Sequence, residues 1–225
     1  VEMVEEGLID KETAVSRVPA NEFSKLFAPI LDNKIIRDLN ITPDTKGLNA
    51  SPGGACGQIY FNAKDAEKAA SEGKDVLLVR VETSPEDIGG MAVSRGIVTC
   101  RGGMTSHAAV VARGMGCPCV SGCGEITINE PKKTLVVNGK TLQEGDYMSI
   151  DGFTGAVYAR KIEVKPSEIM QVLEGTMRES ESTLYQDYKK FMEYVNEIKT
   201  MSVRTNADTP KDARYAIMLG AEGIG

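Results

Sequence analysis

Short apolar runs separated by turn signals occupy residues 49–159, and this pattern limits the chain to a fold built around a sheet. A run such as 75–81 (DVLLVRV) has the length of a strand, and its valines and leucines suit a buried position in a sheet. The dipeptide Asn138-Gly139 in the centre of 134–142 predicts a tight hairpin. We therefore expect residues 49–159 to form a mixed β/α unit with a core of its own.

Helix signals lie between these runs. Asn62 is expected to cap a helix over 63–72, because Asn is a favoured N-cap residue. Pro85 is expected in the first turn of a second helix that Thr83 or Ser84 caps.

Helical periodicity prevails on either side of this unit. Residues 1–32 show short amphipathic helices, with Asp10 as the N-cap of the second. Residues 165–200 are expected to be helical, with a break near Gly175. The second part of that segment carries one apolar stripe of Leu184, Tyr188, Phe191, Val195 and Ile198. Residues 201–225 begin with a strand and a helix, as an α/β repeat does.

Composition excludes several classes of partner. The net charge is −6 and no segment is basic, which argues against binding of nucleic acid. No apolar run approaches the ~20 residues of a membrane span, and no secretory signal is present. We expect a cytoplasmic protein, with organelle targeting left open because a chain that begins with Val and stops in mid-element is expected to be a piece of a longer one.

The five cysteines are expected to be reduced thiols, since their number is odd and no signal peptide precedes them. Cys117, Cys119 and Cys123 also invite a metal-site interpretation. Their spacing is not that of a common zinc site, so we favour small buried thiols beside a strand and predict no metal site.

The segment around His107, the only histidine, carries the chemistry. Gly102 and Gly103 allow the backbone to bend closely, and Thr105 or Ser106 then begins a helix of small residues. Free backbone N–H groups at a helix start bind anions, and a neutral imidazole beside them can accept a phosphoryl group. The same pattern also fits an ordinary capped helix with an exposed histidine.

Charged residues near this segment have two interpretations each. Arg101 and Arg113 flank the histidine and can neutralise a phosphate or remain as solvated surface charges. Glu86 and Asp87 suit the first turn of a helix, where carboxylates complement the macrodipole, or they serve to dock a basic partner domain.

The segment GGMTSHAAVVARGMGCPCVSGCGEI (102–126) resembles the phosphohistidine motif of the pyruvate phosphate dikinase family, which is related to phosphoenolpyruvate synthase and to enzyme I of the sugar phosphotransferase system. Met104 and Ser106 stand where the synthase has Arg and Cys, which favours the dikinase. Three further segments resemble the same family in the same order: MVEEGLIDKETAVSRV, VRVETSPEDIGGM and VRTNADTPKDARYAIMLGAEGIG.

The resemblance implies an α/β fold with four parts. Residues 33–164 would be a swivelling β/β/α phosphohistidine domain. Residues 1–32 would be the helical tail of a nucleotide-binding region, and 165–200 a helical linker. Residues 201–225 would be the truncated start of a TIM barrel that binds phosphoenolpyruvate (PEP) or pyruvate.

The resemblance also implies a carrier function. His107 would take a pyrophosphoryl group from ATP, pass the outer phosphoryl to phosphate and deliver the remaining one to pyruvate, which forms AMP, pyrophosphate and PEP. The full enzyme would use Mg²⁺ and a monovalent cation, neither bound by this chain, and would be a homodimer. Two alternatives remain open: the carrier domain of a PEP synthase, and a non-catalytic interaction module.

The residues around His107 take roles by the same resemblance. Five of them would hold phosphate or orient the ring, namely Arg101, Gly102, Gly103, Thr105 and Ser106. Thr105 would also be a possible site of regulatory phosphorylation, as in plant members. Gly53, Gly54 and Gly175 are candidate hinges for the movement of the carrier.

Overall fold

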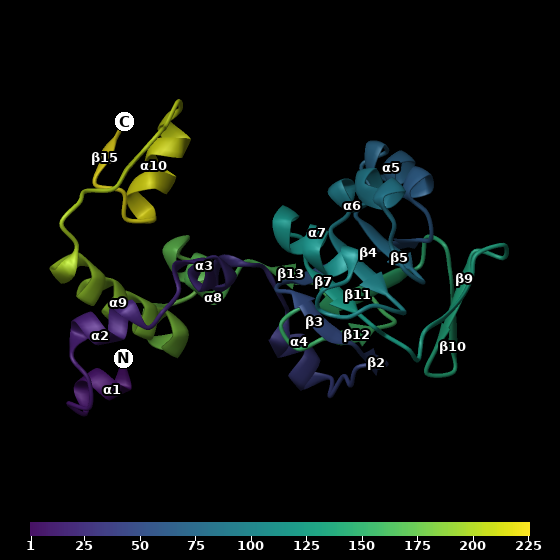
Figure 1. Ribbon diagram of the computed structural model, residues 1–225, viewed down its shortest axis with the longest axis horizontal. Coiled ribbons are helices and arrows are strands. Elements are labelled where there is room, and N and C mark those ends of the chain that lie inside the picture. The colour runs from purple at the N-terminus through teal and green to yellow at the C-terminus, as the bar shows by residue number, and fades with distance from the viewer. The chain divides into compact units, whose positions relative to one another are not determined.

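The computed structural model describes the backbone of residues 1–225 and every side chain except those of Asn21 and Ser24. The chain forms two compact units, one of residues 28–165 and one that combines residues 1–27 with 166–225 (Figure 1).

A mixed sheet of eight strands, in the order β2-β12-β11-β4-β5-β6-β7-β3, forms the centre of unit 28–165. The four neighbours from β4 to β7 are parallel, and every other pairing is antiparallel. Its strands are β2 (Thr45–Lys46), β3 (Leu48–Ser51), β4 (Gly54–Tyr60), β5 (Val76–Arg80), β6 (Gly96–Thr99), β7 (Cys119–Ser121), β11 (Tyr147–Asp151) and β12 (Ala156–Tyr158).

The two edge strands of this sheet are joined by one residue. β2 ends at Lys46 and β3 begins at Leu48, yet they lie at opposite edges. The sheet must therefore roll up until its edges meet at Gly47. A Cβ atom on Gly47 would lie 2.6 Å from the Sγ atom of Cys123, so the closure leaves no room for a side chain.

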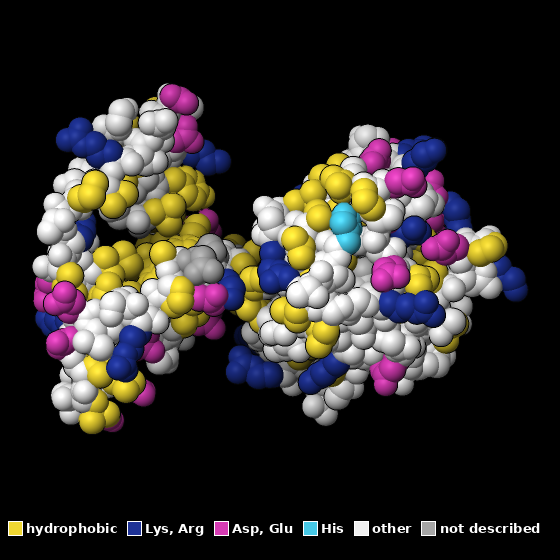
Figure 2. All heavy atoms as spheres, viewed as in Figure 1, with side chains coloured by type: hydrophobic (Ala, Val, Ile, Leu, Met, Phe, Trp, Pro, Cys, Tyr) yellow, Lys and Arg dark blue, Asp and Glu magenta, His cyan; other side chains and the backbone are white. Residues whose placement is uncertain are grey.

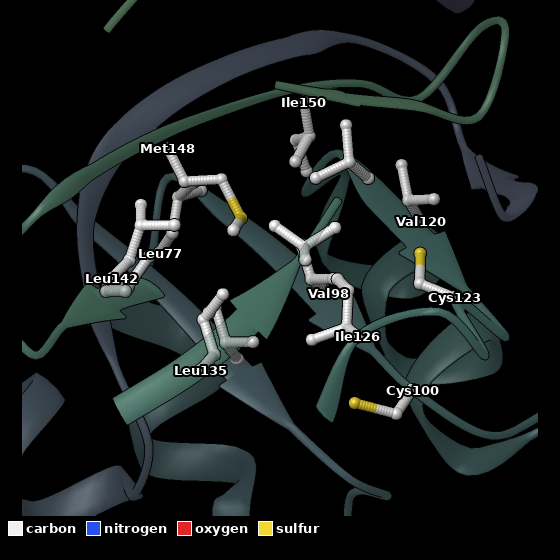
Figure 3. Packing of buried hydrophobic residues seen from close by; sticks show 14 of the residues in the cluster. Leu77, Val98, Cys100, Val120, Cys123, Ile126, Leu135, Leu142, Met148 and Ile150 are labelled. Carbon is white, nitrogen blue, oxygen red and sulfur yellow. The ribbon is translucent and has the colours of Figure 1, made fainter. Parts of the chain in front are cut away.

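Alternate residues of the strands point to opposite faces, and each face has its own core. Leu77 and Val98 belong to the inner cluster, whereas Leu78 and Ile97 belong to the outer one. A three-stranded sheet of β8 (Thr127–Asn129), β9 (Thr134–Val137) and β10 (Lys140–Gln143) adds residues such as Leu135 to the inner cluster (Figure 3). Asn138 and Gly139 both have positive φ, which confirms the predicted hairpin.

Three helices cover the outer face of the sheet: α5 (Ala63–Ser71), α6 (Ile88–Val93) and α7 (His107–Met115) (Figure 1). Their packing residues are small, mostly alanines such as Ala66 and Ala109, which lets the helices lie close to the strands. Asn62 caps α5 by accepting from the backbone N–H of Asp65, as predicted. The unit is therefore a mixed α/β fold, with the eight-stranded sheet at its centre, a three-stranded sheet beside the inner cluster and a helical layer on the outer face.

Gly53 and Gly54, which the sequence suggested as a hinge, lie at the junction of two strands of the sheet. β3 ends at Ser51 and β4 begins at Gly54. Position 54 has no room for a side chain, because a Cβ atom on Gly54 would lie 2.5 Å from the backbone nitrogen of Leu31. Gly53 and Gly54 thus lie within unit 28–165, so the hinge predicted at these glycines does not coincide with a boundary between units.

The chain enters and leaves this unit through adjacent strands. β1 (Ile30–Leu31) pairs antiparallel with β13 (Val164–Lys165), and the short helix α4 (Asn33–Asp38) follows β1. Asp32 caps α4 and also accepts from the ammonium of Lys165 at 2.6 Å. The entering and leaving segments are therefore bound to each other by backbone and side chain.

The other unit is helical in its larger part. Its elements are α1 (Glu2–Glu5), α2 (Lys11–Ser16), α3 (Ala20–Phe23), η1 (Ser24–Phe27), α8 (Glu168–Leu173), η3 (Glu179–Glu181) and α9 (Thr183–Ile198). Asp10 caps α2, as predicted. Gly175, with φ +76°, follows the end of α8 and confirms the predicted break.

The stripe on α9 is only partly covered. Tyr188 packs on Phe23 and Phe27, with ring centroids 6.4 and 5.7 Å apart, whereas Leu184 remains exposed. The most buried residue of α9 is Tyr194, which lies outside the predicted stripe.

The last residues form a small parallel βαβ unit. β14 (Arg204–Thr205) pairs with β15 (Gly223–Ile224), and α10 (Pro210–Met218) connects them after a capping box at Thr209. This confirms the opening of an α/β repeat. Throughout residues 1–225, no helix combines the length and the apolar character that crossing a membrane requires.

Candidate functional site

His107 is the first residue of α7, directly after a loop whose shape depends on one glycine. Ser106 is the N-cap, and its hydroxyl accepts from the backbone N–H of Ala109 at 3.4 Å. Gly102 has φ +115°, and a Cβ atom there would lie 2.9 Å from the Cβ of Ser106. Gly103 has open space around it. Close packing at Gly102 therefore fixes the cap, and the cap places His107 in the first turn.

The loop is tied to the end of β5 and to α7. The backbone N–H groups of Cys100 and Arg101 donate to the carbonyls of Arg80 and Val81 at 3.0 and 2.9 Å. The guanidinium of Arg113 donates to the carbonyls of Met104 and Ala109. Arg113 thus stabilises the loop, because its guanidinium N–H groups donate to backbone carbonyl groups.

The imidazole ring of His107 is held by a residue 24 positions earlier in the chain. The Nδ1 atom lies 3.1 Å from the Oγ1 atom of Thr83, which is buried. Because Nδ1 is engaged, Nε2 is the ring nitrogen left for a reaction partner. The sequence suggested Thr83 only as a helix cap, so this contact is a functional candidate that local pattern did not reveal.

Thr83 is itself held by the turn that follows it. Ser84 caps the short helix η2 (Pro85–Asp87), and its N–H donates to the carboxylate of Asp87 at 2.9 Å. Asp87 is buried and forms an ion pair with Arg80 at 3.3 Å. Asp87 and Glu86 thus lie in the first turn of a helix, as predicted, and the burial of Asp87 leaves only the exposed Glu86 for the alternative interpretation, docking of a basic partner domain.

The remaining predicted site residues line the same loop. Thr105 and Arg101 are both exposed. Within the described part of the chain, neither side chain forms a hydrogen bond or an ion pair. The structure thus brings Gly102, Ser106 and His107 into one constellation, with Thr105 and Arg101 available at its rim.

The surface next to His107 is apolar. Met104 and Val110 are 40% and 56% exposed, on the loop and on α7. Figure 2 shows the single histidine at the surface beside hydrophobic side chains. A surface of this kind allows a partner surface to exclude water around the ring.

The cysteines do not converge on a metal site. Cys119 belongs to the outer core and Cys123 to the inner core, so their side chains point to opposite faces of the sheet. Burial raises the pKa of Cys119 to about 11 and that of Cys123 to about 12, which keeps both as thiols. Within the described residues, no group of three or more His, Cys, Asp or Glu side chains is arranged to hold a metal ion.

Comparison with known proteins gives concordant matches. Residues 72–155 match the family "PEP-utilising enzyme, mobile domain". This range of the chain includes the loop before His107 and α7. The whole chain aligns with "Pyruvate, phosphate dikinase" of Clostridium symbiosum at 46% sequence identity and covers 24% of that protein's length. It aligns with "Pyruvate, phosphate dikinase" of Rhizobium meliloti (strain 1021) at 47% identity and covers 23% of that protein's length. It also aligns with "Pyruvate, phosphate dikinase 1, chloroplastic" of Oryza sativa subsp. japonica at 46% identity and covers 22% of that protein's length. The chain thus spans less than a quarter of the length of these relatives.

Proposed function

Because this chain is a relative of the pyruvate, phosphate dikinases and contains the mobile domain of the PEP-utilising enzymes, we propose that it is the phosphoryl-carrier portion of such a dikinase. The parent enzyme would convert ATP, phosphate and pyruvate into AMP, pyrophosphate and PEP. The observation that carries the proposal is the placement of His107, whose ring contacts Thr83 through Nδ1 at the start of α7, a position where backbone N–H groups favour an anion.

The geometry supports attack by Nε2. With the Nδ1–H group donating a hydrogen bond to Thr83, the lone pair of Nε2 would form a bond to phosphorus while the P–O bond of the donor breaks. The group on His107 then lies near the free N–H groups of the first turn of α7 and near the exposed Arg101, which favour its negative charge. Phosphate would accept the outer phosphoryl as the P–O bond between the two phosphoryl groups breaks, which forms pyrophosphate. The enolate oxygen of pyruvate would then attack the remaining phosphoryl as the N–P bond to His107 breaks, which forms PEP and frees Nε2.

The bound metals of the reaction would lie elsewhere in the parent protein. Mg²⁺, when bound, neutralises phosphate charge during transfer. The described residues of this chain offer no cluster of ligands for it, so the nucleotide and pyruvate sites of other regions would hold Mg²⁺ and the monovalent cation.

The carrier would move as unit 28–165. The chain joins this unit to the remainder only at 27/28 and 165/166, and we place the hinges there. A tethered carrier makes each transfer effectively intramolecular.

The segments on either side of the carrier would belong to the two sites it serves. In the parent, residues 1–27 would continue from a nucleotide-binding region, and the βαβ unit at 201–225 would begin a barrel for PEP or pyruvate. We further propose that the parent enzyme is a cytoplasmic homodimer.

Thr105 is proposed as a regulatory site as well as a rim residue. Its exposed hydroxyl lies two residues from His107. A phosphate there would carry about two negative charges at neutral pH and would repel an incoming phosphoryl donor.

The test uses the full-length parent enzyme with labelled PEP and Mg²⁺. We expect acid-labile, base-stable label on the peptide that contains His107. The variant His107→Ala should show none, whereas Lys132→Ala, an exposed position after β8, should label normally. An unlabelled His107 peptide in the active wild-type enzyme would refute the carrier role.

Two alternatives give different results. A PEP synthase would show the same label, but its activity would not require phosphate or release pyrophosphate. A non-catalytic interaction module would keep the full activity of the parent when His107 is replaced by alanine.

A further inference from the structure

An ion pair between the partly buried Arg80 and the buried Asp87 lies next to the residue that holds the His107 ring. Arg80 and Asp87 are 21% and 6% exposed in their side chains and lie 3.3 Å apart. Asp87 accepts the backbone N–H of Ser84 at 2.9 Å and its hydroxyl at 3.4 Å. Ser84 is bonded directly to Thr83, whose Oγ1 atom lies 3.1 Å from Nδ1 of His107.

Arg80 is anchored on its other side. Its guanidinium donates to the carbonyl of Phe61 at 2.7 Å and to the carboxylate of Glu130 at 2.9 Å. Its own carbonyl accepts the N–H of Cys100, at the start of the loop that leads to α7. One residue at the end of β5 therefore fixes both segments that meet at the histidine.

Stability alone does not account for this arrangement. Burial of an ion pair carries a desolvation penalty, and a well-packed apolar pair often stabilises a fold equally well. An apolar pair could not accept the N–H of Ser84 or donate to the carbonyl of Phe61. What the ion pair adds is the directed placement of the backbone next to Thr83.

We propose that Arg80 and Asp87 are positioning residues for His107, which they serve through Ser84 and Thr83. They hold the Thr83 Oγ1 atom where it accepts a hydrogen bond from the Nδ1–H group, and this tautomer leaves Nε2 unprotonated and free to react. The inference rests on the carrier role proposed above, since it concerns the nitrogen that would accept the phosphoryl group.

The chain allows a direct measurement of this arrangement, because His107 is its only histidine. Labelling of histidine with ¹⁵N in the 225-residue chain gives the signals of one ring alone. In the wild type, at a pH where the ring is neutral, we expect Nδ1 to show the chemical shift of a protonated nitrogen and Nε2 that of an unprotonated one.

The variant Asp87→Asn keeps an oxygen for the Ser84 N–H but removes the charge opposite Arg80. We expect both nitrogen shifts to move toward the average of two tautomers, as they should in Thr83→Val. Thr83→Ser retains the hydroxyl and should restore the wild-type shifts. In the full-length enzyme, Asp87→Asn should slow phosphorylation of His107 about ten- to a hundredfold, as a misplaced reacting group does.

Asp44→Asn is the matched control. Asp44 is also buried, lies 2.6 Å from the ammonium of Lys140 and accepts the N–H of Ala159 at 2.7 Å. We expect it to lose stability while keeping the wild-type shifts of the ring and the wild-type rate of phosphorylation.

The inference is overturned if the wild-type ring carries its proton on Nε2, or if folded Asp87→Asn keeps the wild-type shifts and a rate within about twofold of the wild type. Should Asp87→Asn fail to fold, Arg80→Lys tests the same pair, with the same shifts expected and the same result refuting it. Failure of the carrier role would appear separately, as absence of label on wild-type His107, and would not alter the nitrogen shifts.

Discussion

Replacement of Gly102 by alanine should destabilise unit 28–165 much more than the same change at its neighbour. An alanine at φ +115° is strained by about 1–3 kcal/mol. Its Cβ would also lie 2.9 Å from the Cβ of Ser106, so the N-cap of α7 must shift, and loss of such a cap costs about 1 kcal/mol. We therefore expect Gly102→Ala to lower the free energy of unfolding by about 2–4 kcal/mol.

Gly103→Ala is the internal control, because Gly103 has no positive φ and no atom within 4 Å of an added Cβ. Its effect should stay within about 1 kcal/mol and can be stabilising.

The assay is thiol labelling in urea. All five cysteines lie in unit 28–165 and four of them are buried, so labelling of buried thiols reports on this unit alone. Equal losses for the two variants, or a loss below about 1 kcal/mol for Gly102→Ala, would refute the steric argument.

Two further predictions concern the same unit. Ser106→Ala should cost about 1 kcal/mol through loss of the cap, whereas Thr105→Ala should change stability by less than about 0.5 kcal/mol, both measured by thiol labelling in urea; equal losses would contradict the assignment of the cap. Burial raises the pKa of the Cys117 and Cys123 thiols from 9.0 to about 12, so unfolded thiols ionise first and stability should fall as pH rises from about 9 toward 12, as the urea midpoint by circular dichroism would show. A midpoint that does not change between about pH 8 and about pH 11 would contradict the burial of these thiols.

Local signals in the sequence predicted much of the fold. The cap at Asn62, the hairpin at Asn138-Gly139 and the break at Gly175 all occur where expected. Each depends on the conformational preference of one or two residues, which the sequence displays directly. The order of the eight strands was not predictable in this way, because pairing joins residues far apart in the chain.

In the candidate site, too, local features were predictable and contacts between distant residues were not. The glycine loop, the helix start and His107 are contiguous, so the sequence predicted their arrangement. The contact of Thr83 with the ring spans 24 positions and depends on the neighbouring ends of β5 and β6. At Gly54 the sequence suggested a hinge, but a flexible segment and tight packing both favour glycine, and only the structure separates the two.

The pairing of β1 with β13 makes unit 28–165 an insertion. Its first and last residues are neighbours, so a short loop could replace the whole unit without pulling apart the segments on either side. The same closeness allows the unit to be transplanted into a surface loop of another protein.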